Sequence, residues 1–323
     1  MQKIKFTILG ASGFIGSELK HYLYNKYAKK INQNLVEIYT PTRQEIQELL
    51  FSNNDNNKQN LGIVFYCIGM TADYIKFPFD TINAHVVLLS NLLQKYDFQH
   101  LFYCSSMRLY DSLNSLNSLN SLNSLNNLNN NENTIFHENS KFIFDTQNSR
   151  HLYDLSKALG ENLCLTIFPQ KTTIIRLACV YSEKANSPGF LSELLTEINK
   201  KNNINNNINN NINNNINLNS SPNFGRNYIH LNDVIFGLVF LAENIQKYNQ
   251  NIQIFNFATE KNTYNFEIAN ALKEFNININ FALSNPANFL PLCSINNYKN
   301  IIPKIPTDTI TFLKNYLTEI IKK

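Results

Sequence analysis

The sequence predicts an α/β fold in which helices cover both faces of a doubly wound parallel sheet. An apolar run at 4–9, a glycine-rich turn and a helix-like segment begin the chain in that order. Strand-like and helix-like segments then alternate along much of its 323 residues, of which 43% are apolar. This alternation is typical of a parallel sheet, and the apolar content is sufficient for a large core. We therefore expect a Rossmann-like sheet.

The glycine-rich turn predicts a phosphate-binding site. Its three glycines fall every third residue and precede a helix-like segment at 17–23. Glycines in such a turn allow a tight bend, a close approach of the backbone to a pyrophosphate, and close packing of helix on strand. An ordinary structural turn is the alternative. The residues expected to contact a nucleotide cofactor here are Gly10, Ser12, Gly13, Phe14, Ile15 and Gly16.

The later elements alternate in the same way. We expect strands at 35–39, 61–69, 99–106 and 172–177, and helices at about 79–96 and 153–168. Ligands of doubly wound sheets lie outside the carboxyl ends of the strands. Gly10, Gly69 and Ser106 all fall at such ends, so we expect them to face one site.

Two low-complexity segments interrupt this pattern. The triplet Ser-Leu-Asn occurs five times over 112–126, and isoleucine recurs every fourth residue among asparagines over 202–217. Asparagine is a poor residue for a helix interior. We therefore predict two disordered surface insertions, at about 112–131 and 202–219.

Composition excludes several kinds of partner. The net charge of +4 is small and spread out, without the basic blocks typical of proteins that bind nucleic acid or membrane surfaces. The five cysteines form no C-x-x-C pair, which favours free thiols over disulfides or a zinc site. Because the first strand begins near Met1 and no apolar stretch could cross a bilayer, we expect no signal peptide and no membrane span. These features predict a cytoplasmic protein without a metal.

Four motifs together resemble one family. They are the glycine turn, the segment 104–110, Tyr153 with Lys157, and the segment 226–234. A Tyr-x-x-x-Lys pair alone arises by chance, but Tyr153 follows Ser106 at the family's distance once the first insertion is removed. The chain resembles the extended short-chain dehydrogenases/reductases, also called NAD-dependent epimerase/dehydratases.

The resemblance implies two regions. Residues 1–175 would form the dinucleotide-binding Rossmann domain, completed by about 226–260. Residues 176–225 and 261–323 would form a smaller substrate-binding region, which contains the second insertion.

The resemblance also implies three catalytic residues, Ser106, Tyr153 and Lys157. Tyr153 and Lys157 are four residues apart and share a helix face, where the ammonium can lower the pKa of the phenol. The phenolate can then take the proton of a sugar hydroxyl, while Ser106 hydrogen-bonds the same oxygen. The alternative is structural: Tyr153 packs in the core, Lys157 is a solvated charge and Ser106 ends a strand.

The implied cofactor is NAD or NADP, held by the glycine turn, by Gly69 and by the catalytic pair Tyr153 and Lys157. Family members that bind NAD usually end the second strand with an acidic residue, but Thr40 occupies that position here. Arg43, just beyond it, can pair with a 2′-phosphate, which favours NADP. The alternative is that Arg43 is an ordinary exposed charge at a helix start.

The implied substrate is a nucleotide sugar, as in the synthesis of surface-polysaccharide precursors. Arg226 matches a family position that often contacts the diphosphate, to which a guanidinium is suited. A structural pairing of Arg226 with Asp233 is the alternative. Met107 and Arg108 stand where dehydratases of the family carry an acid pair, so we do not expect dehydration.

The expected reaction is hydride transfer at the C4 carbon of the sugar, by an epimerase or a ketoreductase. Cys179 and His85 replace asparagines that are usual in the family, which weakens the transfer of substrate contacts. Two other functions stay open: a catalytically silent NADP-binding sensor that acts through a partner, and a product disabled by its repeats. A homodimer also stays open.

Overall fold

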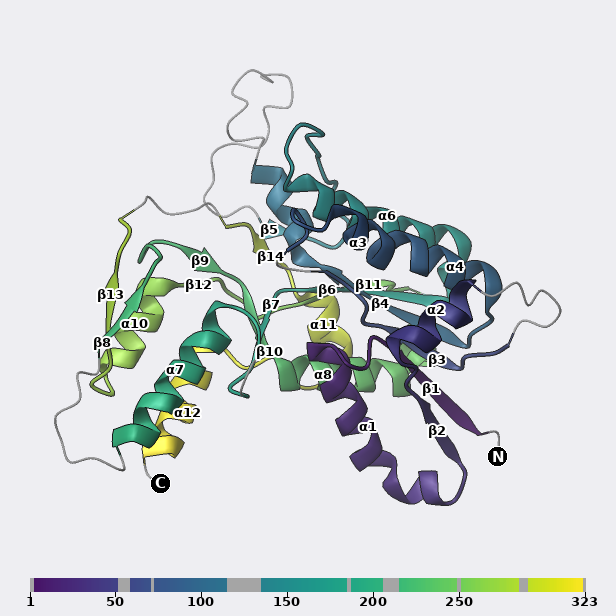
Figure 1. The fold of residues 1–323 in the computed structure, drawn as a ribbon, viewed down its shortest axis with the longest axis horizontal. Helices are drawn as coiled ribbons and strands as arrows, with labels where there is room; N and C mark the ends of the chain where they lie inside the picture. Colours follow the sequence, from purple (N-terminus) through teal and green to yellow (C-terminus); the bar gives the residue numbers. More distant parts are fainter. Residues whose placement is uncertain are drawn as a thin grey trace.

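Six parallel strands form one central sheet. The computed structural model describes residues 3–51, 59–70, 73–114, 135–184, 187–205, 215–248, 251–284 and 290–321. The sheet has the spatial order β11-β6-β4-β3-β1-β2 (Figure 1). The strands are β1 (Ile4–Leu9), β2 (Val36–Tyr39), β3 (Ile63–Tyr66), β4 (His100–Ser106), β6 (Thr172–Leu177) and β11 (Ile254–Phe257). Every neighbouring pair is parallel, which confirms the predicted fold class.

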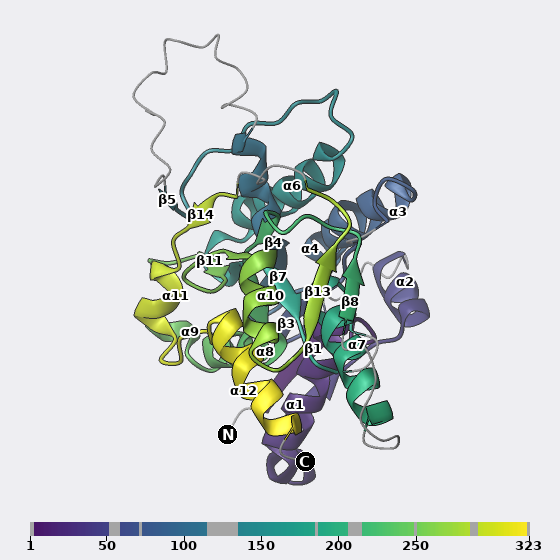
Figure 2. The same ribbon diagram turned by 90° about the vertical axis from the view of Figure 1, so that its left-hand side faces the viewer.

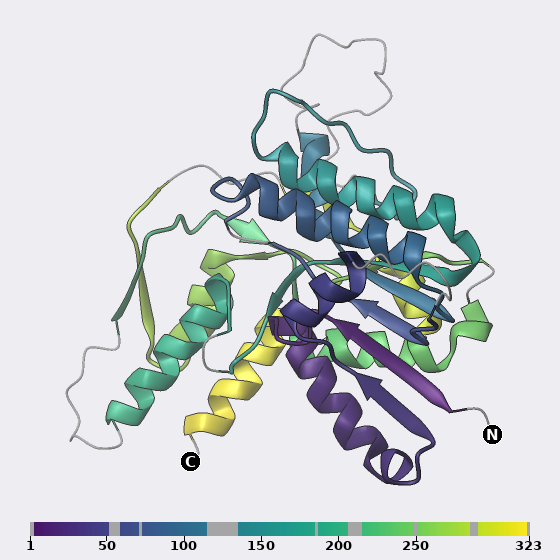
Figure 3. The same cartoon turned by 45° about the vertical axis from the view of Figure 1, so that its right-hand side comes forward.

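Helices cover both faces of this sheet (Figures 1 and 3). One layer contains α1 (Phe14–Asn32) and α8 (Leu231–Glu243), and the other contains α2 (Arg43–Phe51), α4 (Leu88–Lys95) and α6 (His151–Ile167). Phe65 of β3 packs in the core below α1 and α8, whereas its neighbour Tyr66 packs in the core of the other layer. Successive side chains of a strand point to opposite faces, so β3 is apolar at every position.

The expected helix at 79–96 is interrupted. It consists of α3 (Pro78–Ile82), a π-helical turn η1 (Asn83–Val87) and α4. The Ala84 carbonyl in η1 accepts a hydrogen bond from the Tyr66 hydroxyl at 2.5 Å. A π turn changes the direction of the side chains that follow it and is frequent at functional sites. It directs His85 into the interior, where its side chain is fully buried.

A third hydrophobic cluster lies outside the main sheet. It joins α7 (Phe190–Asn205), α10 (Asn265–Lys273) and α12 (Thr309–Ile321) with short paired strands (Figure 2). The pairs in this cluster are β7 (Cys179–Tyr181) with β10 (Tyr228–His230), and β8 (Asn215–Leu218) with β13 (Asn278–Phe281). Two further pairs lie outside it: β9 (Gly225–Arg226) with β12 (Thr263–Tyr264), and β5 (Ile135–Phe136) with β14 (Leu292–Cys293), which packs in the core below α1 and α8. The short helices η2 (Met107–Asn114), η3 (Pro169–Lys171), α9 (Ile245–Tyr248) and α11 (Asn296–Ile301) complete the described elements. None of the described helices is long and apolar enough to cross a membrane.

The two insertions were predicted to be disordered over about 112–131 and 202–219, but the structure has helix at the start of the first range and helix and strand at the ends of the second, so the prediction is wrong there. The asparagine/isoleucine repeat contributes the end of α7 and the strand β8, which pairs in parallel with β13. Ile216 of β8 is fully buried, while the next residue, Asn217, is exposed and accepts a hydrogen bond from Asn280. A strand needs an apolar side chain only at every second position, and the repeat supplies one where it meets the cluster. The backbone of 112–114 belongs to η2; residues 115–134 and 206–214 lie outside the described part of the chain.

Burial of Ile216 predicts that this repeat residue stabilises the fold. Ile216→Ala should lower the free energy of unfolding by about 2–5 kcal/mol, because the substitution leaves a cavity in a packed cluster. Ile305→Ala is the matched control, since Ile305 is 53% exposed and should tolerate the same change. Denaturant unfolding of both variants measures the difference. Equal stabilities would show that β8 does not pack as described.

Candidate active site

The glycine turn links β1 to α1 at the edge where β1 lies beside β3. Gly10 has φ +89°, and a Cβ there would lie 2.9 Å from the carbonyl carbon of Cys67, which follows β3. A Cβ on Gly16 would overlap the Gly10 carbonyl oxygen. Only glycine fits these two positions, so the turn is held tightly against the end of β3. Strand order reverses between β1 and β3, and ligands of doubly wound sheets bind at such a point.

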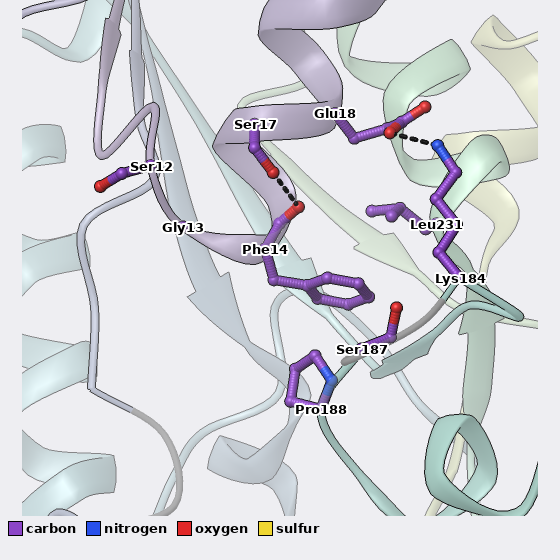
Figure 4. A pocket seen from close by; sticks show the side chains of 9 residues that line it. All are labelled: Ser12, Gly13, Phe14, Ser17, Glu18, Lys184, Ser187, Pro188 and Leu231. Atoms are coloured by element: carbon purple, nitrogen blue, oxygen red, sulfur yellow. Dashed lines mark hydrogen bonds and ion pairs between the residues drawn. The ribbon is translucent and has the colours of Figure 1, made fainter. Parts of the chain in front are cut away.

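The first turn of α1 provides anion-binding groups. Gly13 caps the helix without any side-chain hydrogen bond, so the amides of the first turn keep their hydrogens for a ligand. A pocket of about 300 Å³ opens here, lined on one side by the turn and on the other by Lys184, Ser187 and Pro188 (Figure 4). The Lys184 ammonium lies 2.5 Å from a Glu18 carboxylate oxygen. Free amides and a missing Cβ fit the pyrophosphate of a dinucleotide, whereas the charge of Lys184 is offset by Glu18, which also lines the pocket.

Thr40 and Arg43 lie at the carboxyl end of β2, one strand from the glycine turn. Thr42 and Glu45 form a capping box at the start of α2: the Thr42 amide donates to Glu45 at 2.6 Å, and the Glu45 amide donates to the Thr42 hydroxyl at 3.2 Å. This box fixes the first turn of α2 with the Arg43 side chain exposed. An exposed guanidinium at this edge can reach a ligand that extends from the turn along β2.

The structure brings Ser106, Tyr153 and Lys157 together. Ser106 ends β4, while Tyr153 and Lys157 lie on one face of α6, and all three side chains are buried. Burial is the largest influence on Tyr153 and raises its pKa, whereas a hydrogen bond from Ser106 and the charge of Arg108 lower it. The phenol is therefore desolvated and its pKa is raised overall; Ser106 and Arg108 oppose this rise, whereas Asp154 and Cys179 add to it.

Lys157 and Gly69 lie next to each other at the bottom of this site. The Lys157 ammonium donates to the Cys104 carbonyl at 2.8 Å and lies 5.1 Å from the centre of the Tyr103 ring. Burial lowers the pKa of Lys157 to about 8. A Cβ on Gly69 would lie 3.4 Å from both the Lys157 ammonium and a ring nitrogen of His85. Gly69 thus lies directly against Lys157 and His85, just beyond the end of β3.

His85 supports Tyr153 through a chain of hydrogen bonds. The Met70 amide donates to Nε2 of His85 at 3.1 Å, which leaves the ring proton on Nδ1. Nδ1 donates to the Ser156 hydroxyl at 2.8 Å, and this hydroxyl donates to the Tyr153 carbonyl at 2.8 Å. Burial, assisted by the charge of Lys157, lowers the pKa of His85 to about 2, so the ring is neutral. The ring also meets the Tyr153 ring edge-on, with centres 5.2 Å apart.

Arg226 lies on β9, beside Cys179. Its guanidinium is 3.9 Å from the Cys179 sulfur and 4.8 Å from the centre of the Phe224 ring. The alternative pairing with Asp233 is wrong, because Asp233 binds the Lys304 ammonium at 2.7 Å and accepts the Thr307 amide at 3.0 Å. Arg226 is exposed. An anionic ligand can therefore reach it.

Two sets of residues escaped the sequence analysis. Arg108 was noted only as a departure from the dehydratases, yet its guanidinium carbon lies 4.5 Å from the centre of the Tyr153 ring. The pair Glu161 and Arg176, buried and 2.7 Å apart, fastens α6 to β6. The signal available in the sequence was Arg176, the single charged residue of the strand-like segment 172–177. No group of three or more metal-ligating side chains occurs among the residues that the structure describes.

Comparisons with known proteins agree with this architecture. RMD from Pseudomonas aeruginosa, in complex with NADPH, has a TM-score of 0.67 at 15% identity, covering 99% of both chains. UDP-glucuronic acid 4-epimerase from Bacillus cereus, in complex with UDP-glucuronic acid and NAD, has a TM-score of 0.65 at 15% identity, covering 99% of both. dTDP-glucose 4,6-dehydratase from Bacillus anthracis, in complex with NAD, has a TM-score of 0.64 at 14% identity, covering 99% of this chain and 97% of that one. At 14–15% identity, this structural similarity shows that the chain shares the fold of these proteins.

Sequence comparison gives the family. No curated protein matches the chain, but the model of one family matches residues 6–258. That range includes the glycine turn, the end of β4, both catalytic candidates on α6, and Arg226. The chain belongs to the NAD dependent epimerase/dehydratase family.

Proposed function

We propose that the protein is an NAD(P)-dependent enzyme that transfers hydride at the C4 carbon of a nucleotide sugar. The observation that carries this proposal is the convergence of Ser106, Tyr153 and Lys157 beside a glycine turn whose amides can bind a pyrophosphate. The ligands of the structural neighbours support it, because they include UDP-glucuronic acid, NAD and NADPH.

In this proposal Tyr153 is the base. Its phenolate accepts the proton of the sugar hydroxyl, and Ser106 holds the same oxygen in line by a hydrogen bond. The nicotinamide ring, when bound, supplies the hydride acceptor. Lys157 binds a ribose hydroxyl and places a positive charge beneath the site, and its pKa of about 8 keeps most of that charge near neutral pH. Neutral His85 holds the Tyr153 turn of α6 in place through Ser156.

Arg226 is the proposed ligand of the substrate diphosphate. It is exposed on β9, and its guanidinium can bind phosphate oxygens in a bidentate manner. Met107 and Arg108 follow Ser106 where dehydratases of the family carry acids, so we propose epimerisation or ketone reduction in place of dehydration. The chain shares its fold with a dehydratase as well as an epimerase, so this choice rests on these two residues.

Product analysis tests the proposed function. The purified chain is incubated with a panel of nucleotide sugars and their 4-keto forms, with NAD, NADP or their reduced forms, and the products are separated by chromatography. An epimerase returns the C4 epimer without net consumption of cofactor, whereas a ketoreductase consumes one reduced cofactor for each product. A chain that binds cofactor but converts no sugar would instead favour the silent sensor.

Loss of the Tyr153 hydroxyl should stop the reaction and spare cofactor binding. Tyr153→Phe should lower kcat by about 10²-fold or more, because general-base catalysis is lost while the ring remains. The dissociation constant of the cofactor should stay within a few-fold, as measured by fluorescence titration. Tyr24→Phe, which removes a hydroxyl from a tyrosine of α1 that is 40% exposed, is the control and should retain its activity. A Tyr153→Phe variant that keeps most of its kcat would refute the assignment.

Arg43 should determine the preference for NADP. Arg43→Ala should raise the dissociation constant for NADP about tenfold or more relative to that for NAD, because hydrogen bonds to charged groups contribute about 1.5–3 kcal/mol. Gln44→Ala, the next exposed residue of α2, is the control and should change neither constant. Calorimetric titration of each variant with both cofactors measures the ratio. An equal effect on the two cofactors would make Arg43 an ordinary surface charge.

A further inference from the structure

Arg108 lies over the ring of the proposed base. It belongs to η2, which continues directly from the end of β4 at Ser106. Its guanidinium carbon is 4.5 Å from the centre of the Tyr153 ring and 4.9 Å from that of Tyr74, whose hydroxyl accepts a hydrogen bond from Nη2 at 3.3 Å. The Tyr74 and Tyr153 rings are themselves 5.5 Å apart. Arg108 is therefore held between two aromatic rings, with its charge directed at Tyr153.

Two carboxyl groups partly offset the charge of Arg108: Asp154, and Asp111, whose pKa burial raises and the charge of Arg108 lowers. The nearest carboxylate, that of Asp154, lies 3.8 Å from Nε, and neither Nε nor this carboxylate oxygen has a hydrogen-bond partner within the described part of the chain. Burial raises the pKa of Asp154 to about 6, so below that pH this carboxyl loses the charge that opposes Arg108. Because no carboxylate pairs with it closely, the guanidinium keeps a charge that acts on the Tyr153 ring 4.5 Å away.

The other groups around Tyr153 do not replace this cation. Ser106 donates a neutral hydrogen bond, and Cys179 and Asp154 oppose ionisation of the phenol. His85 meets the ring edge-on and is neutral. The Lys157 ammonium donates to the Cys104 carbonyl and is not among the main groups that shift the pKa of Tyr153.

We propose that Arg108 is a positioning residue whose guanidinium stabilises the phenolate form of Tyr153. The inference deepens the proposed function and rests on it for its catalytic meaning. An opposite charge within about 4–6 Å favours the ionised form of a group by about 1–3 pKa units. At the position where dehydratases of the family carry an acidic residue, this chain carries Arg108, whose positive charge assists the proposed base Tyr153.

Titration of one labelled residue tests the proposal without a sugar. A difluorotyrosine incorporated at position 153 has a phenol more acidic than that of tyrosine, and its fluorine resonance reports ionisation while the chain stays folded. Arg108→Met should raise its pKa by about one unit or more, and Arg108→Lys should restore much of the difference. Arg150→Met removes a more exposed guanidinium nearby, bound loosely to Asp111, and should leave the titration unchanged. A phenol pKa that is the same with and without the Arg108→Met substitution would overturn the proposal.

A second variant, Asp154→Asn, should shift the pKa of the labelled phenol in the opposite direction. It also provides a test if Arg108→Met does not fold. Asp154→Asn removes the opposing carboxylate, so the labelled phenol should ionise at lower pH. An unchanged or higher pKa in Asp154→Asn would contradict the proposed balance of charges.

Catalytic measurements separate this proposal from the proposed function. If a substrate is converted, kcat/KM should rise with pH as Tyr153 ionises, and Arg108→Met should move that rise to higher pH. If no sugar is converted, the proposed function fails, but the fluorine titration still decides whether Arg108 stabilises the phenolate.

Discussion

The buried contact between α6 and the sheet is the constraint on which the site depends. Glu161 of α6 binds the Arg176 guanidinium of β6 at 2.7 Å and accepts the Ser105 hydroxyl of β4 at 2.5 Å. Gly160 lets the helix approach so closely that a Cβ there would overlap the Tyr103 hydroxyl. Removing one partner of a buried ion pair costs about 3–5 kcal/mol, because the other charge is left unpaired. This contact sets the height of α6, and hence of both its catalytic candidates, above the end of β4.

Around that contact, the charged and titratable groups of the site form two sets, one beneath α6 and one at the mouth of the site. Beneath α6, neutral His85 and the π turn hold the backbone of Tyr153, while Lys157 keeps its positive charge at a pKa of about 8. At the mouth, Arg108 lies over the Tyr153 ring, and exposed Arg226 lies beside Cys179. The site thus holds one buried ammonium beneath α6 and two guanidinium groups nearer the surface, an arrangement consistent with the proposed nucleotide-sugar substrate.

Sequence patterns were sufficient where local rules decide the structure. Five of the six strands of the sheet, the helices that follow β3 and β4, and the first turn follow from apolar runs and glycine spacing, because each element buries a face that its own residues define; β11 and α2 were not predicted. Contacts between elements that are distant along the chain could not be predicted from these local patterns. The position of Ile216 depends on a strand that is distant along the chain, β13. Likewise, the partner of Arg176 lies on a different element, and the effect of Arg108 on Tyr153 depends on how η2 folds back over α6.

The most direct test of the account follows hydride transfer itself. The chain is loaded with NAD or NADP and mixed rapidly with each nucleotide sugar of a panel, while the absorbance of the reduced nicotinamide is recorded. The account predicts that at least one sugar produces a transient or stable reduced cofactor, and that Tyr153→Phe abolishes the signal without releasing the cofactor. A chain that binds the cofactor yet forms no reduced nicotinamide and no product with any sugar would contradict it.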